Sequence, residues 1–197
     1  VAHELGLWAV ADGMGGYSHG DVASRIVVDE LSTLGRTISS LDQRARLKHR
    51  IWRAHRQIAD HAEREVKANV GSTVVALGVF GNEYCCAWSG DSRCYLLRGG
   101  DIEQINRDHT RVQGMVTRGE ITAEEARTWP GRNVITRAVG VSEDPRVEVE
   151  TGLVRPNDTF LLCSDGLTEH LSYEQINETV TRGLAAKLSA QRCCEEL

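Results

Sequence analysis

The chain has 197 residues, of which 41% are hydrophobic and 26% charged, and this length and composition predict one globular domain with one core. Its 23 Lys and Arg residues against 28 Asp and Glu residues give a formal net charge of -5 at pH 7, which argues against nucleic acid or a membrane surface as the main partner. No apolar run approaches the roughly 20 residues that a membrane-spanning helix needs. Small molecules and proteins remain as substrate classes.

Six cysteines occur, none in a C-x-x-C pair, and most lie inside apolar runs. This pattern predicts reduced thiols packed in the core of a cytoplasmic protein rather than a disulfide scaffold. The chain begins at Val1 without a methionine or a charged leader, and it stops at Leu197 inside an expected helix. We therefore expect it to be truncated at both ends relative to a longer protein.

The first elements in chain order are a short strand at 7–11, a glycine loop at 12–16 and a helix whose apolar residues continue to Leu34. The polar segment 42–66 carries one apolar stripe, which predicts a helix with one buried face. Three histidines on that helix are expected to be solvated rather than metal ligands: His49, His55 and His61.

Antiparallel strands are predicted next. Residues 72–80 and 83–88 flank a Gly-Asn turn and form one hairpin, and 93–98 and 102–105 flank a glycine turn and form a second. Consecutive hairpins indicate an antiparallel sheet rather than an alternating parallel one.

The polar segment at about 107–133 has weak periodicity and predicts an inserted helical flap over this scaffold. Strands are expected again at 147–149 and 160–163, followed by closing helices at 173–181 and 184–197. Helices at both ends and strands between them favour an α+β sandwich.

Three apolar strands end in an aspartate beside a glycine, namely Asp12, Asp91 and Asp165. A single aspartate beside a glycine at a strand end is typical of a turn and needs no further function. Three such strand ends lying side by side, however, would bring several negative charges into one small volume. Those charges repel unless protons or cations neutralise them, and a divalent cluster is the natural counterion. A ligand set of oxygen atoms alone favours Mg²⁺ or Mn²⁺ over Zn²⁺.

Other catalytic patterns are absent from the sequence. Neither G-x-G-x-x-G nor G-x-x-x-x-G-K-[ST] is satisfied, and there is no G-x-S-x-G elbow and no cysteine with the spacing of a cysteine phosphatase loop. What remains is a metal cluster that lowers the pKa of a bound water for attack on phosphorus.

Six motifs occur in a distinctive order: Asp12-Gly13-Met14-Gly15-Gly16, Gly71-Ser72-Thr73, Gly90-Asp91-Ser92-Arg93, Asp108-His109-Thr110, Ile135-Thr136-Arg137-Ala138-Val139-Gly140 and Cys163-Ser164-Asp165-Gly166-Leu167-Thr168. From about Trp8 to Leu171 the chain resembles the metal-dependent protein Ser/Thr phosphatases of type 2C in their compact bacterial form. The resemblance implies a single phosphatase-like domain over 1–197, built as a four-layer sandwich of two antiparallel β-sheets flanked by helices, with a flap insertion.

The same resemblance implies a set of cation ligands. Asp12 would bridge two cations, the Gly13 carbonyl would ligate one of them and Asp165 the other, so Asp12 and Asp165 are the expected catalytic residues. Asp91 resembles a ligand of a third, weaker cation shared with Asp165, so two or three Mg²⁺ or Mn²⁺ ions are expected. Four residues are expected to support the loops instead, with Arg93 in an internal ion pair: Thr73, Ser92, Arg93 and Thr136.

The function implied is hydrolysis of phosphoserine and phosphothreonine in proteins that a bacterial Ser/Thr kinase phosphorylates. Family members also carry an arginine and an acidic pair upstream and an Asp-Asn motif downstream, none of which lies in this chain, so the resemblance leaves open whether the chain is active by itself. Two alternatives remain open: a module that binds phosphorylated partners without cleaving them, and a hydrolase of small phosphate esters such as nucleotides.

Overall fold

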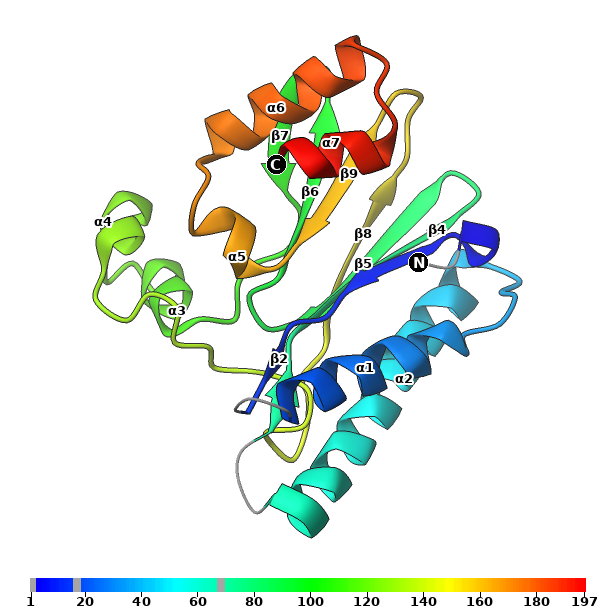
Figure 1. Cartoon of the computed structure of the whole chain (residues 1–197), viewed down its shortest axis with the longest axis vertical. Coiled ribbons are helices and arrows are strands. Elements are labelled where there is room, and N and C mark those ends of the chain that lie inside the picture. Colours follow the sequence, from blue (N-terminus) through cyan, green and yellow to red (C-terminus); the bar gives the residue numbers. More distant parts are fainter. Residues whose placement is uncertain (1–2, 16–18, 67–69) are drawn as a thin grey trace.

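A computed structural model describes residues 3–15, 19–66 and 70–197 of the chain. Two antiparallel β-sheets pack face to face, with helices on both outer faces (Figure 1). The predicted α+β sandwich is therefore confirmed. Gly16, the last residue of the predicted glycine loop, lies outside the described residues.

The first sheet has four strands. In spatial order they are β1 (Leu7–Val10), β4 (Val74–Phe80), β5 (Glu83–Ser89) and β8 (Glu148–Leu153). β4 and β5 form the predicted hairpin, and β1 pairs with β4 in a register that places Val10 opposite Val75. Two helices cover the outer face of this sheet: α1 (His19–Ser32) and α2 (Ser40–His61) (Figure 1).

The second sheet has three strands in the order β7 (Asp101–Gln104), β6 (Arg93–Arg98) and β9 (Thr159–Cys163). β6 and β7 form the second predicted hairpin, and β9 adds to the other edge of β6. Two closing helices lie over its outer face: α6 (Tyr173–Ala185) and α7 (Ala190–Glu196) (Figure 1). A capping box between Ser172 and Gln175 fixes the start of α6.

Apolar side chains fill three separate spaces between these layers. One cluster lies between α1, α2 and the first sheet and includes Leu47. A second lies between the two sheets and includes Trp88 and Cys94, and a third joins Leu161 of β9 to Ile176 of α6. The sequence-based expectation of one core is thus wrong in detail, because each sheet is covered on both faces.

β4 illustrates this double burial. Val74 and Ala76 belong to the cluster under the helices, whereas Val75 and Leu77 belong to the cluster between the sheets. Successive side chains of a strand point to opposite faces, so a continuous apolar run satisfies both layers.

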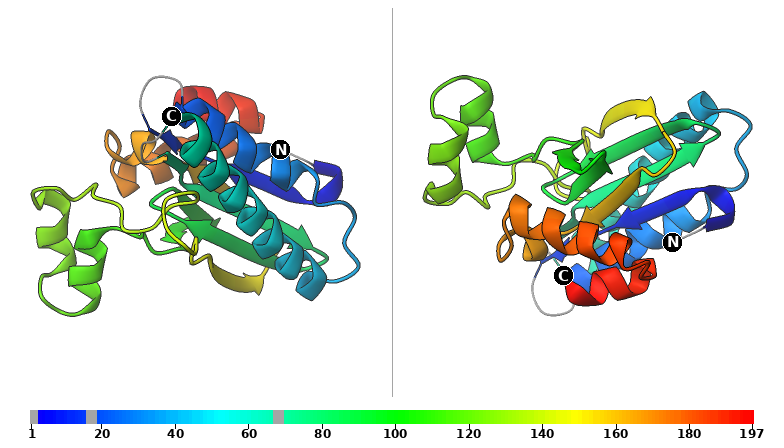
Figure 2. Two further views of the ribbon diagram at one scale, coloured as in Figure 1. Left: turned by 90° about the horizontal axis from the view of Figure 1, so that it is seen from below. Right: turned by 90° about the horizontal axis from the view of Figure 1, so that it is seen from above.

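Short elements complete the described part of the fold: η1 (His3–Leu5), β2 (Gly13–Met14), η2 (Ala62–Val66), β3 (Gly71–Ser72), α3 (Arg111–Thr117), α4 (Ala123–Thr128) and α5 (Asp165–Thr168). α3 and α4 project from the body of the molecule in both views of Figure 2. They form the predicted flap, but 107–110 are hydrogen-bonded to the sandwich, since the carbonyl of Arg107 accepts from Trp88 Nε1 and the amide of His109 donates to Gly90. The name flap is therefore kept for residues 111–133.

The expectation that His55 is solvated is wrong. This side chain is 2% exposed, and its Nδ1 atom accepts a hydrogen bond of 2.9 Å from the backbone amide of Gly140. Burial lowers the pKa of His55, so the neutral ring fastens the segment around Gly140 to α2.

The helix boundaries also differ from those predicted. α2 ends at His61 and is followed by a π-helical turn, and the last helical region is split because Lys187 adopts a φ of 56° between α6 and α7. All six cysteines are free, and only Cys194 among them is exposed. Within the described ranges, no helix is both long and apolar enough to cross a membrane.

Two leucines on α2 provide a matched test of this packing. Leu47→Ala should lower the free energy of unfolding by about 2–5 kcal/mol, because Leu47 is fully buried between α2 and the first sheet. Leu41→Ala on the same helix should change it by about 0.5 kcal/mol or less, since Leu41 is 63% exposed. Urea unfolding of the two variants measures both values, and equal losses would contradict this assignment of faces.

Candidate metal centre

Asp12 follows β1, and its backbone is fixed by the strand beside it. Its carbonyl accepts hydrogen bonds from the Thr73 amide at 2.8 Å and the Ser72 hydroxyl at 3.1 Å, and its own amide donates to Thr73 Oγ1 at 3.2 Å. The Ser72 and Thr73 side chains therefore hold this aspartate in place rather than leaving it on a loose turn.

Asp165 follows β9 and begins the short helix α5. Burial raises the pKa of Asp12, the negative charge of Asp165 raises it further, and a hydrogen bond from the Ser164 side chain lowers it. The ends of β1 and β9 thus bring these two carboxylates within electrostatic reach of each other, although they belong to different sheets.

Asp91 lies in the turn between β5 and β6 and is 8% exposed. Burial raises the pKa of Asp91 to about 6, with a further increase from the negative charge of Asp165. Asp165 therefore acts electrostatically on both of the other aspartates. That the three carboxylates share cations stays a prediction.

The carboxylates of Asp12, Asp91 and Asp165 fit a hard divalent cation only in combination with other oxygen atoms. Across 3–15, 19–66 and 70–197, no group of three or more Asp, Glu, His or Cys side chains is arranged so that it could hold a metal ion. The aspartates instead form two pairs that share Asp165, and Mg²⁺ or Mn²⁺ would complete its coordination with carbonyl and water oxygens. A cation between these pairs would offset the charge with which Asp165 raises the pKa of Asp12 and of Asp91.

Gly13 lies where β2 meets the start of α1. A Cβ atom on Gly13 would lie 1.8 Å from the Gly20 carbonyl oxygen, and one on Gly20 would lie 2.6 Å from the Gly13 carbonyl oxygen. Both positions therefore require glycine because two backbones are in close contact. Ligation of a cation by the Gly13 carbonyl stays a prediction.

The Asp91 turn is held by side chains that the sequence analysis expected to be supports. Ser92 Oγ lies 2.7 Å from Thr73 Oγ1, which links this turn to the backbone of Asp12. Arg93 forms an internal ion pair with Asp108, with Nη2 to Oδ2 at 2.6 Å and Nε to both carboxylate oxygens at 3.0 Å. The predicted ion pair of Arg93 is confirmed.

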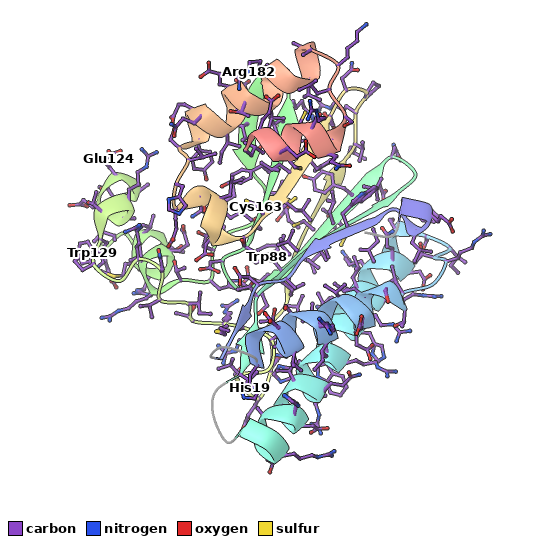
Figure 3. The ribbon with its side chains drawn as sticks, in the orientation of Figure 1. His19, Trp88, Glu124, Trp129, Cys163 and Arg182 are labelled. Carbon is purple, nitrogen blue, oxygen red and sulfur yellow. The ribbon has the colours of Figure 1, made fainter. Side chains whose placement is uncertain are left out.

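A cavity of about 860 Å³ opens beside the aspartates, between the flap and the segment that joins α5 to α6. Asp91 and Asp165 line it together with Arg93 and Asp108, and the flap contributes Arg127 among others. Figure 3 shows Trp88 and Cys163 in the middle of the molecule and Glu124 and Trp129 on the flap. The cavity therefore connects the acidic region with the projecting insertion.

Sequence reasoning gave no role to three residues of this region. Ser164 lowers the pKa of Asp12, Asp108 forms an ion pair with Arg93, and His109 contacts Gly90. The signal was present, since all three lie within motifs that the sequence analysis singled out, but their partners are distant in sequence.

Comparison with known proteins gives a consistent result. A family model described as "Protein phosphatase 2C" matches residues 2–197. The chain is 39% identical over 176 residues to the serine/threonine protein phosphatase PstP of Mycobacterium tuberculosis, and 38% identical over 176 residues to the serine/threonine phosphatase stp of Listeria monocytogenes. These alignments cover 88% and 86% of this chain.

The chain spans only 34% of the length of the mycobacterial relative and 69% of the Listeria relative. Among solved structures, the catalytic domain of PstP in complex with two manganese ions is 35% identical, with a TM-score of 0.80. That match covers 96% of this chain and 80% of the other.

Replacement of Asp91 should change how stability depends on pH in the protein treated with EDTA. Between about pH 4 and pH 6 the folded chain binds a proton at Asp91 that the unfolded chain, with a pKa of 3.8, releases. The stability that this proton contributes is present at low pH and lost as the pH rises through 6. The Tm of Asp91→Asn relative to wild type should therefore increase from pH 4.5 to pH 7.

Asp158→Asn provides the control. A hydrogen bond from Arg98 lowers the pKa of Asp158 to about 2, so both its folded and unfolded forms are ionised throughout this range. The Tm difference for Asp158→Asn should stay constant from pH 4.5 to pH 7. A constant difference for Asp91→Asn as well would contradict the raised pKa of Asp91.

Proposed function

This chain belongs to the protein phosphatase 2C family, and on that premise we propose that it hydrolyses phosphoserine and phosphothreonine in proteins with the help of divalent cations. The observation that carries the proposal is that Asp165 lies within electrostatic reach of both Asp12 and Asp91, which come from other strand ends. A relative of known structure contains two manganese ions, which supports a cation site of this kind.

Four residues would hold the cations: Asp12, Gly13, Asp91 and Asp165. Mg²⁺ or Mn²⁺ bound there would lower the pKa of a water molecule and neutralise phosphate oxygens. We propose two such ions, with a third where Asp91 and Asp165 face each other.

The contribution of the chain itself is to keep these groups in place. Thr73 holds the backbone of Asp12 and, through Ser92, the turn of Asp91. The Ser164 side chain, directly before Asp165, lowers the pKa of Asp12 and so favours its charged form. Because the carboxylates are positioned before a cation arrives, less free energy is needed to organise the site when it binds.

The cavity beside the site favours a protein substrate over a small phosphate ester. Its volume of about 860 Å³ is more than a phosphate group needs, and flap residues form one wall of it. A segment of a protein substrate on either side of the phosphorylated residue could lie there. We propose as substrates the phosphoproteins that a bacterial Ser/Thr kinase produces.

The proposal is tested by metal-dependent hydrolysis of a phosphothreonine peptide and of p-nitrophenyl phosphate. Activity should require Mn²⁺ or Mg²⁺, and Asp12→Ala and Asp165→Ala should each reduce kcat/KM by about 100-fold or more, because both remove a charge that holds the cations. Asp29→Ala, which changes an exposed aspartate on α1, should leave kcat/KM unchanged.

The same assay separates the alternatives. Binding of the phosphopeptide without hydrolysis would identify a recognition module, and a higher kcat/KM on nucleotides than on phosphopeptides would identify a hydrolase of small esters. Activity that persists in EDTA or in both aspartate variants would refute the proposed function.

A further inference from the structure

The segment 106–110 runs along the turn that carries Asp91 and is bonded to it at several points. Trp88 Nε1 donates to the Arg107 carbonyl at 2.8 Å, and the Asn106 side chain bonds both the Ser92 carbonyl and the Cys94 amide, at 2.9 and 2.8 Å. This segment leads directly into α3, so the root of the flap and the Asp91 turn form one bonded unit.

His109 makes the closest connection within that unit. Its Nδ1 atom accepts from the Gly90 amide at 3.1 Å, and its own amide donates to the Gly90 carbonyl at 2.9 Å. The ring is 6% exposed and stacks on Trp88 with centroids 5.8 Å apart. Burial lowers the pKa of His109, and the charge of Arg137 lowers it further, so the ring is neutral and Nδ1 can accept.

Gly90 is a position whose conformation must be held from outside. Its φ is 117°, which side chains rarely allow, and a Cβ atom there would lie 2.7 Å from Thr73 Cβ. Glycine also has more conformational freedom than any other residue, and it directly precedes Asp91. The two hydrogen bonds to His109 therefore restrict the backbone that sets where the Asp91 carboxylate points.

His109 also joins the two ends of the flap. Its carbonyl accepts from both the amide and the hydroxyl of Thr136, at 2.7 and 3.0 Å. The next residues complete the closure, since Thr110 forms a β-bridge with Ile135. The chain entering the flap and the chain leaving it thus meet at the residue that holds Gly90.

We propose that His109 is a positioning residue that fixes the Asp91 carboxylate for a cation and couples the occupancy of that cation site to the order of the flap. The inference rests on the proposed cation site at Asp91. Binding there would fix Gly90, which would strengthen the bonds at the flap root, and by reciprocity an ordered flap root would increase the affinity for the cation.

Two substitutions separate this role from a general effect on packing. His109→Leu keeps an apolar group against Trp88 but removes the acceptor for the Gly90 amide. His109→Asn retains an acceptor, because its Oδ1 atom can occupy the place of Nδ1. Each variant is also made in an Asp91→Asn background, where the cation site in question has lost its carboxylate.

The first readout is Mn²⁺ titration by calorimetry, with MnCl₂ as the only added ligand. The Mn²⁺ binding event that is present in wild type and absent in Asp91→Asn is assigned to the Asp91 site. His109→Leu should weaken its binding by about tenfold, a typical effect of removing a group behind a metal ligand, and His109→Asn should restore most of the affinity. In the Asp91→Asn background, His109→Leu should have no further effect on Mn²⁺ binding.

The second readout is trypsin cleavage within the flap, which exposes Arg118, Arg127 and Arg132. Mn²⁺ should slow cleavage at these sites in the wild-type protein and in His109→Asn, but not in His109→Leu. Thermal unfolding of each variant shows whether it is folded at the temperature of the assay.

Each outcome bears on the proposal. Equal Mn²⁺ affinity in wild type and His109→Leu would overturn it. So would a loss of Mn²⁺ affinity on His109→Leu that is as large in the Asp91→Asn background as in the wild-type background. A rate of flap cleavage in the wild-type protein that does not change with Mn²⁺ would also overturn it. Wild-type protein that binds no Mn²⁺ would refute this inference and the proposed function together. Mn²⁺ binding and hydrolysis that are unaffected by His109→Leu would refute only the inference.

Discussion

The repulsion that Asp165 exerts on Asp12 and on Asp91 is the constraint on which the rest of this structure depends. Asp12, Asp91 and Asp165 come from three strand ends, and in the absence of a cation the negative charge of Asp165 disfavours ionisation of the other two. Such an arrangement lowers stability, and it persists only because the surrounding structure is stabilised independently. Three apolar clusters and the hydrogen bonds of Thr73 provide that stabilisation.

Much of the fold follows from local sequence patterns. Both hairpins were predicted because short apolar runs and the glycine turns between them act within a few residues of one another. The burial of His55 could not be predicted in this way, since its partner Gly140 is 85 residues away and the helix around His55 is polar. The division of the last helical region into two helices was predicted, but its position was wrong: the break was expected at 182–183 and lies around Lys187, where no glycine or proline marks it.

In the candidate site, too, the residues marked by local sequence were predicted and those with partners distant in sequence were not. The three aspartates could be found because each follows an apolar strand and precedes or follows a glycine, which are features of the sequence alone. Ser164 and Asp108 could not be given roles, because their interactions with Asp12 and Arg93 depend on which strand ends meet. Sequence therefore predicts the charged groups, and the structure supplies what orients them.

The closure of the flap at its root bears on how such a protein can diversify. Because the bridge between Thr110 and Ile135 brings the two ends together, everything beyond it is a peripheral insertion on a finished scaffold. Lengthening a loop whose ends are already joined costs little, about 0.6 kcal/mol for each doubling. Evolution can therefore exchange residues of the flap while the interior of the sandwich stays unaltered.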